Sequence, residues 1–168
     1  MYTPPAYAEE DLAHLHALMH EWSFATLVCN GGEAGPVATH LPFLLAPGGP
    51  SGLGILTSHM ARNNPQWEVL EGQEALVIFQ GPNAFVSVNW YDNHKTFPTW
   101  NYGAVHAYGR VTLERDPEAL RALLVRTIGT FDAPAGDWRR EDMPEEMIAP
   151  RLRAIVGLAI GVARVAGM

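Results

Sequence analysis

The stretch that decides the fold runs from residue 75 to residue 110 and reads ALVIFQGPNAFVSVNWYDNHKTFPTWNYGAVHAYGR. Hydrophobic and polar residues alternate through much of it, and β-branched and aromatic residues are frequent, a composition typical of half-buried β-strands. We expect strands over 75–79, 84–91 and 104–113. The sequence QGPN is predicted to form a hairpin turn between the first two strands, because Gly81-Pro82 cannot continue a ladder.

The same stretch concentrates aromatic rings and polar side-chain tips. It contains two Trp and three Tyr, together with Asn101, His106 and Arg110. Flat rings can stack on a planar ligand while Asn and His side chains supply donors and acceptors around its rim, so this composition is typical of a cofactor cleft. The alternative interpretation is a half-buried sheet whose aromatic residues pair across strands without any ligand.

Length and composition indicate one compact domain over residues 1–168. The chain is 48% hydrophobic, and a chain of this size buries roughly two thirds of its unfolded surface. No apolar run approaches the ~18 residues of a membrane span, and the N-terminus lacks a signal-peptide pattern, so we expect a cytoplasmic protein without membrane contact. Cys29 has no second cysteine to pair with and is expected to be a small buried hydrophobic residue.

The charges divide the chain into two unlike halves. The net charge is −7; residues 1–94 contain nine Asp or Glu and a single basic residue, Arg62, whereas residues 95–168 contain ten Lys or Arg beside nine acids. Duplex DNA is held largely by Lys and Arg on its phosphates, so direct DNA binding is not expected. Arg62 is the cation of the first half that could meet an anionic ligand.

The chain is organised as a helix, a run of strands and a helical return. Leu12, Leu15, Leu18, Met19 and Trp22 recur at helical spacing after an acidic start. Further strands are expected over 24–28, 37–45, 53–59 and 154–162. Closely spaced strands with short turns indicate an antiparallel sheet or barrel in an α+β fold, and not a parallel doubly wound fold.

Three further helices are expected. A short one over 61–70 would be capped by Asn64 with Pro65 at its first position, so that backbone N–H groups and Arg62 converge in the outline of an anion site. A longer helix starts at 116–118, and a third, over 147–153, is expected to break near Pro150, after a polar segment at 136–147.

Several familiar sites are absent from the sequence. His16 and His20 have the i, i+4 spacing of a metal pair, but no carboxylate or cysteine ligand accompanies them, so we expect the histidines of this helix, which include His14, to face solvent and predict no metal site. There is no GxSxG elbow, Walker loop or GxGxxG motif after a strand, which excludes the usual hydrolase, NTPase and Rossmann signatures. No helix-turn-helix pattern is present.

The motifs HLPF, SHMARNNPQW, EALVIFQGPNAFVS, WY, PTWNYGAVHAYGRV and RAIVG follow one another in an order that resembles the PaiB-like family of FMN-binding negative transcriptional regulators. The resemblance covers essentially the whole chain. It implies a split antiparallel β-barrel with peripheral helices, related to pyridoxamine-phosphate oxidases and flavin reductases. It also implies a homodimer with FMN in a groove between two subunits.

The resemblance also implies a set of cofactor contacts. Arg62 and Asn63 take the place of the phosphate-binding residues after the third strand, with hydroxyl donors at the end of that strand. The strand of THLPF edges the flavin ring. Ring and ribityl contacts come from Gln80 and the loop Trp100-Asn101-Tyr102, with the other subunit as one source of these contacts. The complete set of expected contacts is Thr39, His40, Leu41, Pro42, Thr57, Ser58, His59, Arg62, Asn63, Gln80, Trp100 and Asn101.

Two departures from the family pattern affect this expectation. The loop between WY and PTW is shorter than is common, and the basic tail that commonly follows the last strand is missing after VAGM, which predicts weaker FMN binding if that tail holds the cofactor. Three functions stay open: an FMN-binding regulator acting through a partner protein or a redox signal, a flavin-dependent oxidoreductase or flavin reductase, and a haem-binding split barrel with His40, His59 or His106 as ligand. The first two share one groove, and no catalytic acid or base is forced by spacing.

Overall fold

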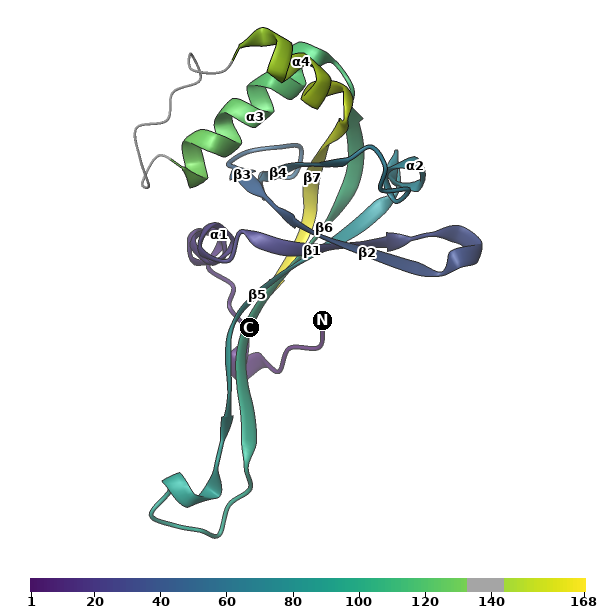
Figure 1. Cartoon of the computed structure of the whole chain (residues 1–168). Coiled ribbons are helices and arrows are strands. Elements are labelled where there is room, and N and C mark those ends of the chain that lie inside the picture. The colour runs from purple at the N-terminus through teal and green to yellow at the C-terminus, as the bar shows by residue number, and fades with distance from the viewer. Residues whose placement is uncertain (133–143) are drawn as a thin grey trace.

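The computed structural model describes residues 1–132 and 144–168, and in these ranges the strands form one antiparallel seven-stranded sheet in the order β2-β1-β5-β6-β7-β4-β3 (Figure 1). The strands are β1 Phe24–Asn30, β2 Pro36–Pro42, β3 Leu44–Ala46, β4 Ile55–Ala61, β5 Glu74–Val86, β6 Thr99–Glu114 and β7 Ile155–Gly167. The helices are α1 Leu12–Glu21, α2 Trp67–Leu70, α3 Pro117–Phe131 and α4 Glu145–Arg153, with short 3₁₀ turns at Pro5–Tyr7, Gly32–Ala34 and Val88–Trp90. The expected antiparallel α+β fold is confirmed.

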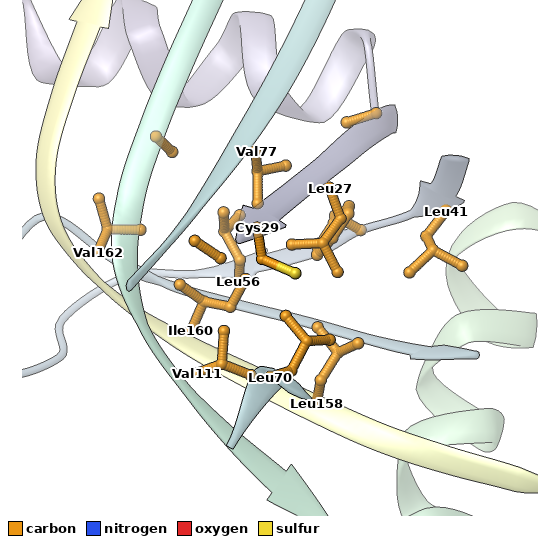
Figure 2. Packing of buried hydrophobic residues seen from close by; sticks show 14 of the residues in the cluster. Leu27, Cys29, Leu41, Leu56, Leu70, Val77, Val111, Leu158, Ile160 and Val162 are labelled. Atoms are coloured by element: carbon orange, nitrogen blue, oxygen red, sulfur yellow. The ribbon is translucent and has the colours of Figure 1, made fainter. Parts of the chain in front are cut away.

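The sheet curls around a hydrophobic core without closing. Alternate residues of each strand point inward, and Leu27, Val77 and Leu56 are fully buried among them (Figure 2). The end strands β2 and β3 do not pair with each other. Across the open side, the Ser58 hydroxyl of β4 donates a hydrogen bond of 2.6 Å to the carbonyl of Pro42 in β2. The barrel is therefore split, as expected, and Cys29 lies buried inside it.

Two aspartates start the long helices as the sequence predicts. The Asp11 carboxylate accepts hydrogen bonds from the N–H groups of Ala13 and His14 at the start of α1. Asp116 caps α3 in the same way. Leu120 of α3 packs against Gly157 of β7, and a Cβ atom added at Gly157 would lie 2.9 Å from the leucine side chain. The helix α3 therefore covers the sheet at β7.

The prediction of a hairpin turn at QGPN is wrong. β5 runs without interruption from Glu74 to Val86, and a bulge between Gln80 and Asn83 accommodates Gly81-Pro82 within the strand. A bulge leaves residues out of the ladder, so the missing N–H of a proline costs no ladder hydrogen bond there. The reversal of the chain comes later, between Val86 and Thr99, and β5 and β6 together form an arm that projects far beyond the barrel (Figure 1).

Other expected boundaries also shift. The strand expected over 37–45 divides at Phe43, whose N–H leaves the ladder to bond the carbonyl of Ser23 at 2.8 Å. The helix α4 continues through Pro150, which removes one backbone hydrogen bond but does not end the helix. β7 continues to Gly167, beyond the expected end at residue 162. The part of the expected polar segment at 136–143 lies outside the described residues.

Candidate functional site

One side of the sheet faces away from the core, and we call it the outer face. Strand register places His40, Thr26, Ile78, His106 and Ala166 in one row across β2, β1, β5, β6 and β7. The neighbouring row contains Ala38, Val28, Leu76, Tyr108 and Arg164. Directly paired residues lie on the same side of a sheet, so these ten side chains share the outer face.

At one end of this face an aromatic pair lies open to solvent. The rings of Phe24 and His40 stack with centroids 6.2 Å apart and an interplanar angle of 26°. His40 Nδ1 lies 2.9 Å from the Thr26 hydroxyl, and Phe24 is 68% exposed. The β1–β5 pairing ends at Thr26 and Ile78, and exposed Gln80 follows two residues after Ile78 on β5. Of the predicted contacts, His40 therefore lies against an exposed ring, and Gln80 lies exposed on a strand of the same sheet.

The other predicted residues of β2 divide between the two sides of the strand. Pro42 shares the outer side with His40, whereas Thr39 and Leu41 point inward. The Thr39 hydroxyl accepts a hydrogen bond of 2.8 Å from the side-chain amide of Asn64, and Leu41 is part of the core. Side-chain contacts with a ligand on the outer face are thus open to His40 and Pro42, and not to Thr39 or Leu41.

On β4 the same alternation applies. Thr57 and His59 point outward, and Ser58 is 2% exposed with its hydroxyl already bonded to Pro42. Of the two predicted hydroxyl donors, only Thr57 can be reached from outside in this conformation. Burial lowers the pKa of His59, which lies opposite Gly157.

Arg62 occupies a structural position at the end of β4. Its Nε donates to the carbonyl of Arg153 at 2.9 Å and its Nη2 donates to the carbonyl of Ile155 at 3.1 Å. The guanidinium also lies 5.8 Å from the centre of the Trp67 ring. Two guanidinium nitrogens thus tie β4 to the start of β7, and Nη1 has no hydrogen bond within the described ranges.

The expected helix beside Arg62 is shorter than predicted. α2 spans four residues, and Asn64 caps the preceding turn through a 3.0 Å hydrogen bond from the N–H of Gln66. The groups that converge on Arg62 are carbonyls and not N–H groups, so the expected helix-end anion site is not formed. Asn63 is exposed next to it.

The last two predicted contacts lie on the arm. Trp100 pairs with Phe85 and Asn101 pairs with Ala84, and the Trp100 indole donates to the Asn83 side chain at 3.2 Å. They border a cleft of about 490 Å³ at the base of the arm, a volume in the range of small-molecule sites. Its lining consists of Tyr2, Pro4, Tyr7, Thr99, Trp100, Asn101, Tyr102 and Met168.

The predicted residues do not all converge within one chain. Arg62 and Arg115 both lie against the Trp67 ring, and Arg115 directly follows the end of β6. Trp100 stands at the opposite end of the same 16-residue strand. At about 3.3 Å per residue that strand spans roughly 50 Å along its path, so a single mononucleotide cannot touch both ends.

A further group of side chains includes Arg164, which the sequence analysis missed. The guanidinium carbon of Arg164 lies 3.5 Å from the centre of the Tyr108 ring, and the Tyr108 hydroxyl lies 3.5 Å from His106 Nδ1. Burial, the N-terminal amino group and Arg164 together lower the pKa of His106. Alternation in HAYGR could have placed His106 and Tyr108 together, but the last strand was expected to end before Arg164.

The histidines of α1 have local partners. His14 Nδ1 lies 2.5 Å from a Glu9 carboxylate oxygen, and the carbonyl of Leu53 lies 2.9 Å from His16 Nε2. The prediction that these histidines face solvent is wrong for His16, which is half-buried. Within residues 1–132 and 144–168, no group of three or more His, Cys, Asp or Glu could hold a metal ion. None of the helices described is long and apolar enough to cross a membrane.

Comparison with known proteins agrees with this architecture. Residues 1–164 match the family described as "Putative FMN-binding domain". The chain is 35% identical to the Bacillus subtilis protein "Protease synthase and sporulation protein PAI 2" over 166 residues, 96% of this chain and 77% of that protein.

Two solved structures share the fold. The flavocytochrome Anf3 from Azotobacter vinelandii superposes with a TM-score of 0.69 at 13% identity, over 99% of this chain and 71% of the other. The FAD and heme binding protein from Mycobacterium smegmatis gives a TM-score of 0.66 at 17% identity, over 96% and 72%. At these identities the two structures establish the split-barrel fold alone.

Proposed function

Since the chain belongs to the "Putative FMN-binding domain" family, we propose that it binds FMN as a homodimer and influences gene expression through a partner protein or a redox signal. The observation that carries the proposal is the family match over residues 1–164, read together with the open outer face around Phe24 and His40. Bound FMN would supply one- and two-electron redox chemistry, and the chain would supply the position and surroundings of the flavin.

The residues of the outer face fit a flavin. Phe24 and His40 offer exposed ring faces, which stack favourably on a planar heteroaromatic system. Exposed Gln80 on β5 offers an amide donor and acceptor. Half-buried Val28, Leu76 and Ile78 continue this face as an apolar floor. A planar cofactor with a polar rim thus finds both kinds of contact on these strands.

The arm supports the proposed dimer. Large aromatic side chains are exposed along it: Phe85, Trp90, Tyr91, Phe97, Trp100 and Tyr102. Exposed aromatic surface of this extent usually marks an interaction site. Trp100 and Arg62 lie near opposite ends of β6, which follows a path of roughly 50 Å. One cofactor can therefore contact the predicted residues around Trp100 and those around Arg62 only if the two sets come from two copies of the chain. In the proposed dimer the arm of one copy covers the flavin on its partner.

The regulatory role rests on the relative in B. subtilis, whose name refers to protease synthesis and sporulation. The net charge of −7 argues against autonomous DNA binding, which leaves a protein partner or a redox signal as the route. An oxidoreductase would use the same groove. Steady turnover of reduced nicotinamide with a flavin-loaded sample would favour that alternative over the regulator.

The first experiment is to purify the protein and record its visible spectrum and its sedimentation velocity at micromolar concentration with and without added FMN. We expect flavin absorption bands, either as purified or after reconstitution, and a dimer. Phe24→Ala should weaken FMN binding, whereas Phe131→Ala, which removes a half-exposed ring from α3, should not. A monomer that neither contains nor takes up FMN would overturn the proposal.

A further inference from the structure

Three cationic or potentially cationic groups surround the hydroxyl-bearing ring of Tyr108 on the outer face. The Arg164 guanidinium lies over the ring at 3.5 Å, His106 Nδ1 lies 3.5 Å from the hydroxyl oxygen, and the N-terminal amino group donates to that oxygen at 3.1 Å. The first of these contacts places the guanidinium of Arg164 over the ring. The edge of a guanidinium held in this way stays free for the paired hydrogen bonds that planar oxyanions accept.

No carboxylate in the described part of the chain forms an ion pair with this cluster. Among the described residues, Arg164 forms neither a salt bridge nor a hydrogen bond with an acidic side chain. The row of paired residues nearest to Tyr108 that contains a carboxylate has Glu74 opposite Arg110. The carboxylate in that row thus has a cation on the neighbouring strand. Groups of like charge that gather without a counter-charge repel one another, and a bound anion would relieve that repulsion.

We propose that Arg164, Tyr108 and His106 form an oxyanion-binding site for the carboxylate or phosphate of an organic ligand whose apolar body lies along the outer face. Leu76 and Ile78 lie beside the cluster on β5, and both are half-exposed. An anionic head and a flat apolar body are the two features that this surface complements. The site is separate from Arg62, which is tied to the carbonyls at the start of β7.

His106 reports on occupancy of this site. The groups around it are Tyr108 on its own strand, uncharged Ile78 on β5, Arg164 on β7 and the N-terminal amino group. Burial and the two cations disfavour imidazolium and lower the pKa of His106. A bound oxyanion adds the opposite charge and should raise that pKa, and by linkage the anion should bind more tightly as His106 becomes protonated.

The test is an NMR titration of the histidine ring signals, with His106 assigned by comparison with His106→Gln. Inorganic phosphate and benzoate are the probes, each titrated at constant ionic strength against chloride. We expect a saturable shift of the His106 signal and a higher pKa in wild type and in Arg126→Gln, which neutralises an exposed arginine of α3. In Arg164→Gln the affinity should fall about ten- to a hundredfold.

FMN and riboflavin distinguish the sources of the oxyanion. If FMN moves the His106 signal and riboflavin does not, the site receives the cofactor phosphate; if benzoate moves it and FMN does not, it receives a separate organic acid. No saturable response to either simple anion, or an equal response in Arg164→Gln, would overturn the site. The FMN affinity of wild type and Arg164→Gln is measured in parallel. The absence of the oxyanion site can then be distinguished from the absence of FMN binding.

Discussion

The indole ring of Trp22 lies so close to Gly103 that a Cβ atom at residue 103 would stand 2.7 Å from Cη2 of the ring. Gly81, on the neighbouring strand, is approached by the same ring even more closely. Gly81 lies within the bulge of β5 between Gln80 and Asn83, and Gly103 lies opposite that bulge on β6. The absence of side chains at 81 and 103 therefore lets Trp22 pack across the base of the arm.

Gly103→Ala should destabilise the protein by about 1–3 kcal/mol, because the added methyl group must displace a large ring in a packed site. Urea unfolding measures this difference. The matched control is Gly129→Ala on α3, where no described residue lies within 4 Å of an added Cβ atom. That replacement should add about 0.5–1 kcal/mol to stability through helix propensity. If Gly103→Ala were as benign as the control, the close packing of Trp22 would be refuted.

Phe97→Ser should shift the proposed dimer toward monomer without lowering the unfolding free energy of the monomer, since this ring is 88% exposed in the single chain. Loss of a buried aromatic anchor commonly weakens an interface by about 2 kcal/mol or more. Sedimentation velocity across a concentration series measures the dimer constant. Phe131→Ser on α3 is the control and should leave the dimer dissociation constant unchanged. Equal dissociation constants for the two variants would show that the arm is not part of the interface.

The sequence predicted the class of fold correctly because alternation and capping are local signals. Asp11 and Asp116 start helices through hydrogen bonds to residues two or three positions ahead, and such bonds can be anticipated from spacing. The false turn at Gly81-Pro82 has a non-local cause. Trp22, which is distant in the sequence, packs against the bulge. Turn propensities depend on neighbouring residues and cannot predict such a contact.

The site was harder to predict for a related reason. A motif such as THLPF names five neighbours, but a strand points alternate side chains to opposite sides, so His40 and Leu41 cannot serve one ligand surface with their side chains. Arg62 was singled out by its charge as the expected phosphate contact, which stays a prediction. Its hydrogen bonds to Arg153 and Ile155, however, depend on a segment 91 and 93 residues later in the chain.

Arg62→Ala should have two separable effects. Loss of its hydrogen bonds to the carbonyls of Arg153 and Ile155 should lower the unfolding free energy of the cofactor-free protein by about 1.5–3 kcal/mol. If Nη1 also meets the FMN phosphate, FMN affinity should fall roughly ten- to a hundredfold. Riboflavin lacks the phosphate and should bind the wild type and the variant about equally. Equal losses for both flavins would indicate a structural effect alone.

Stability should decline as the pH falls below the ordinary histidine range. The pKa of His59 is lowered by burial, so the unfolded chain, with a value near 6.5, binds the proton more readily than the folded chain. Where the unfolded state binds more protons, stability falls with falling pH, and the contribution is fully present above the unfolded pKa. His59→Gln should reduce the pH dependence of the thermal unfolding temperature between about pH 7.5 and pH 5.5. An unchanged slope would assign the acid sensitivity to other groups, of which His106 is the first candidate.

The purified protein should not bind DNA sequence-specifically by itself. Specific complexes rest on several cationic contacts to phosphates together with side chains that reach base edges, and this chain has a net charge of −7 with one basic residue among its first 94. Arg139 and Arg140 lie outside the described residues, and acids follow them directly in the sequence. On α4, Arg151 donates to the carbonyl of Met147, and neighbouring Glu145 pairs with Arg121 of α3 at 2.5 Å.

A promoter-length duplex titrated at ~150 mM salt decides the question, because weak non-specific binding fades at that ionic strength. We expect no sequence-selective binding at nanomolar concentration, with or without FMN. The informative variants neutralise Arg139 and Arg140 together or Arg151 and Arg153 together. Selective nanomolar binding that either pair of substitutions abolishes would establish a direct repressor, and its loss on neutralising Arg151 and Arg153 would place the DNA contacts on α4.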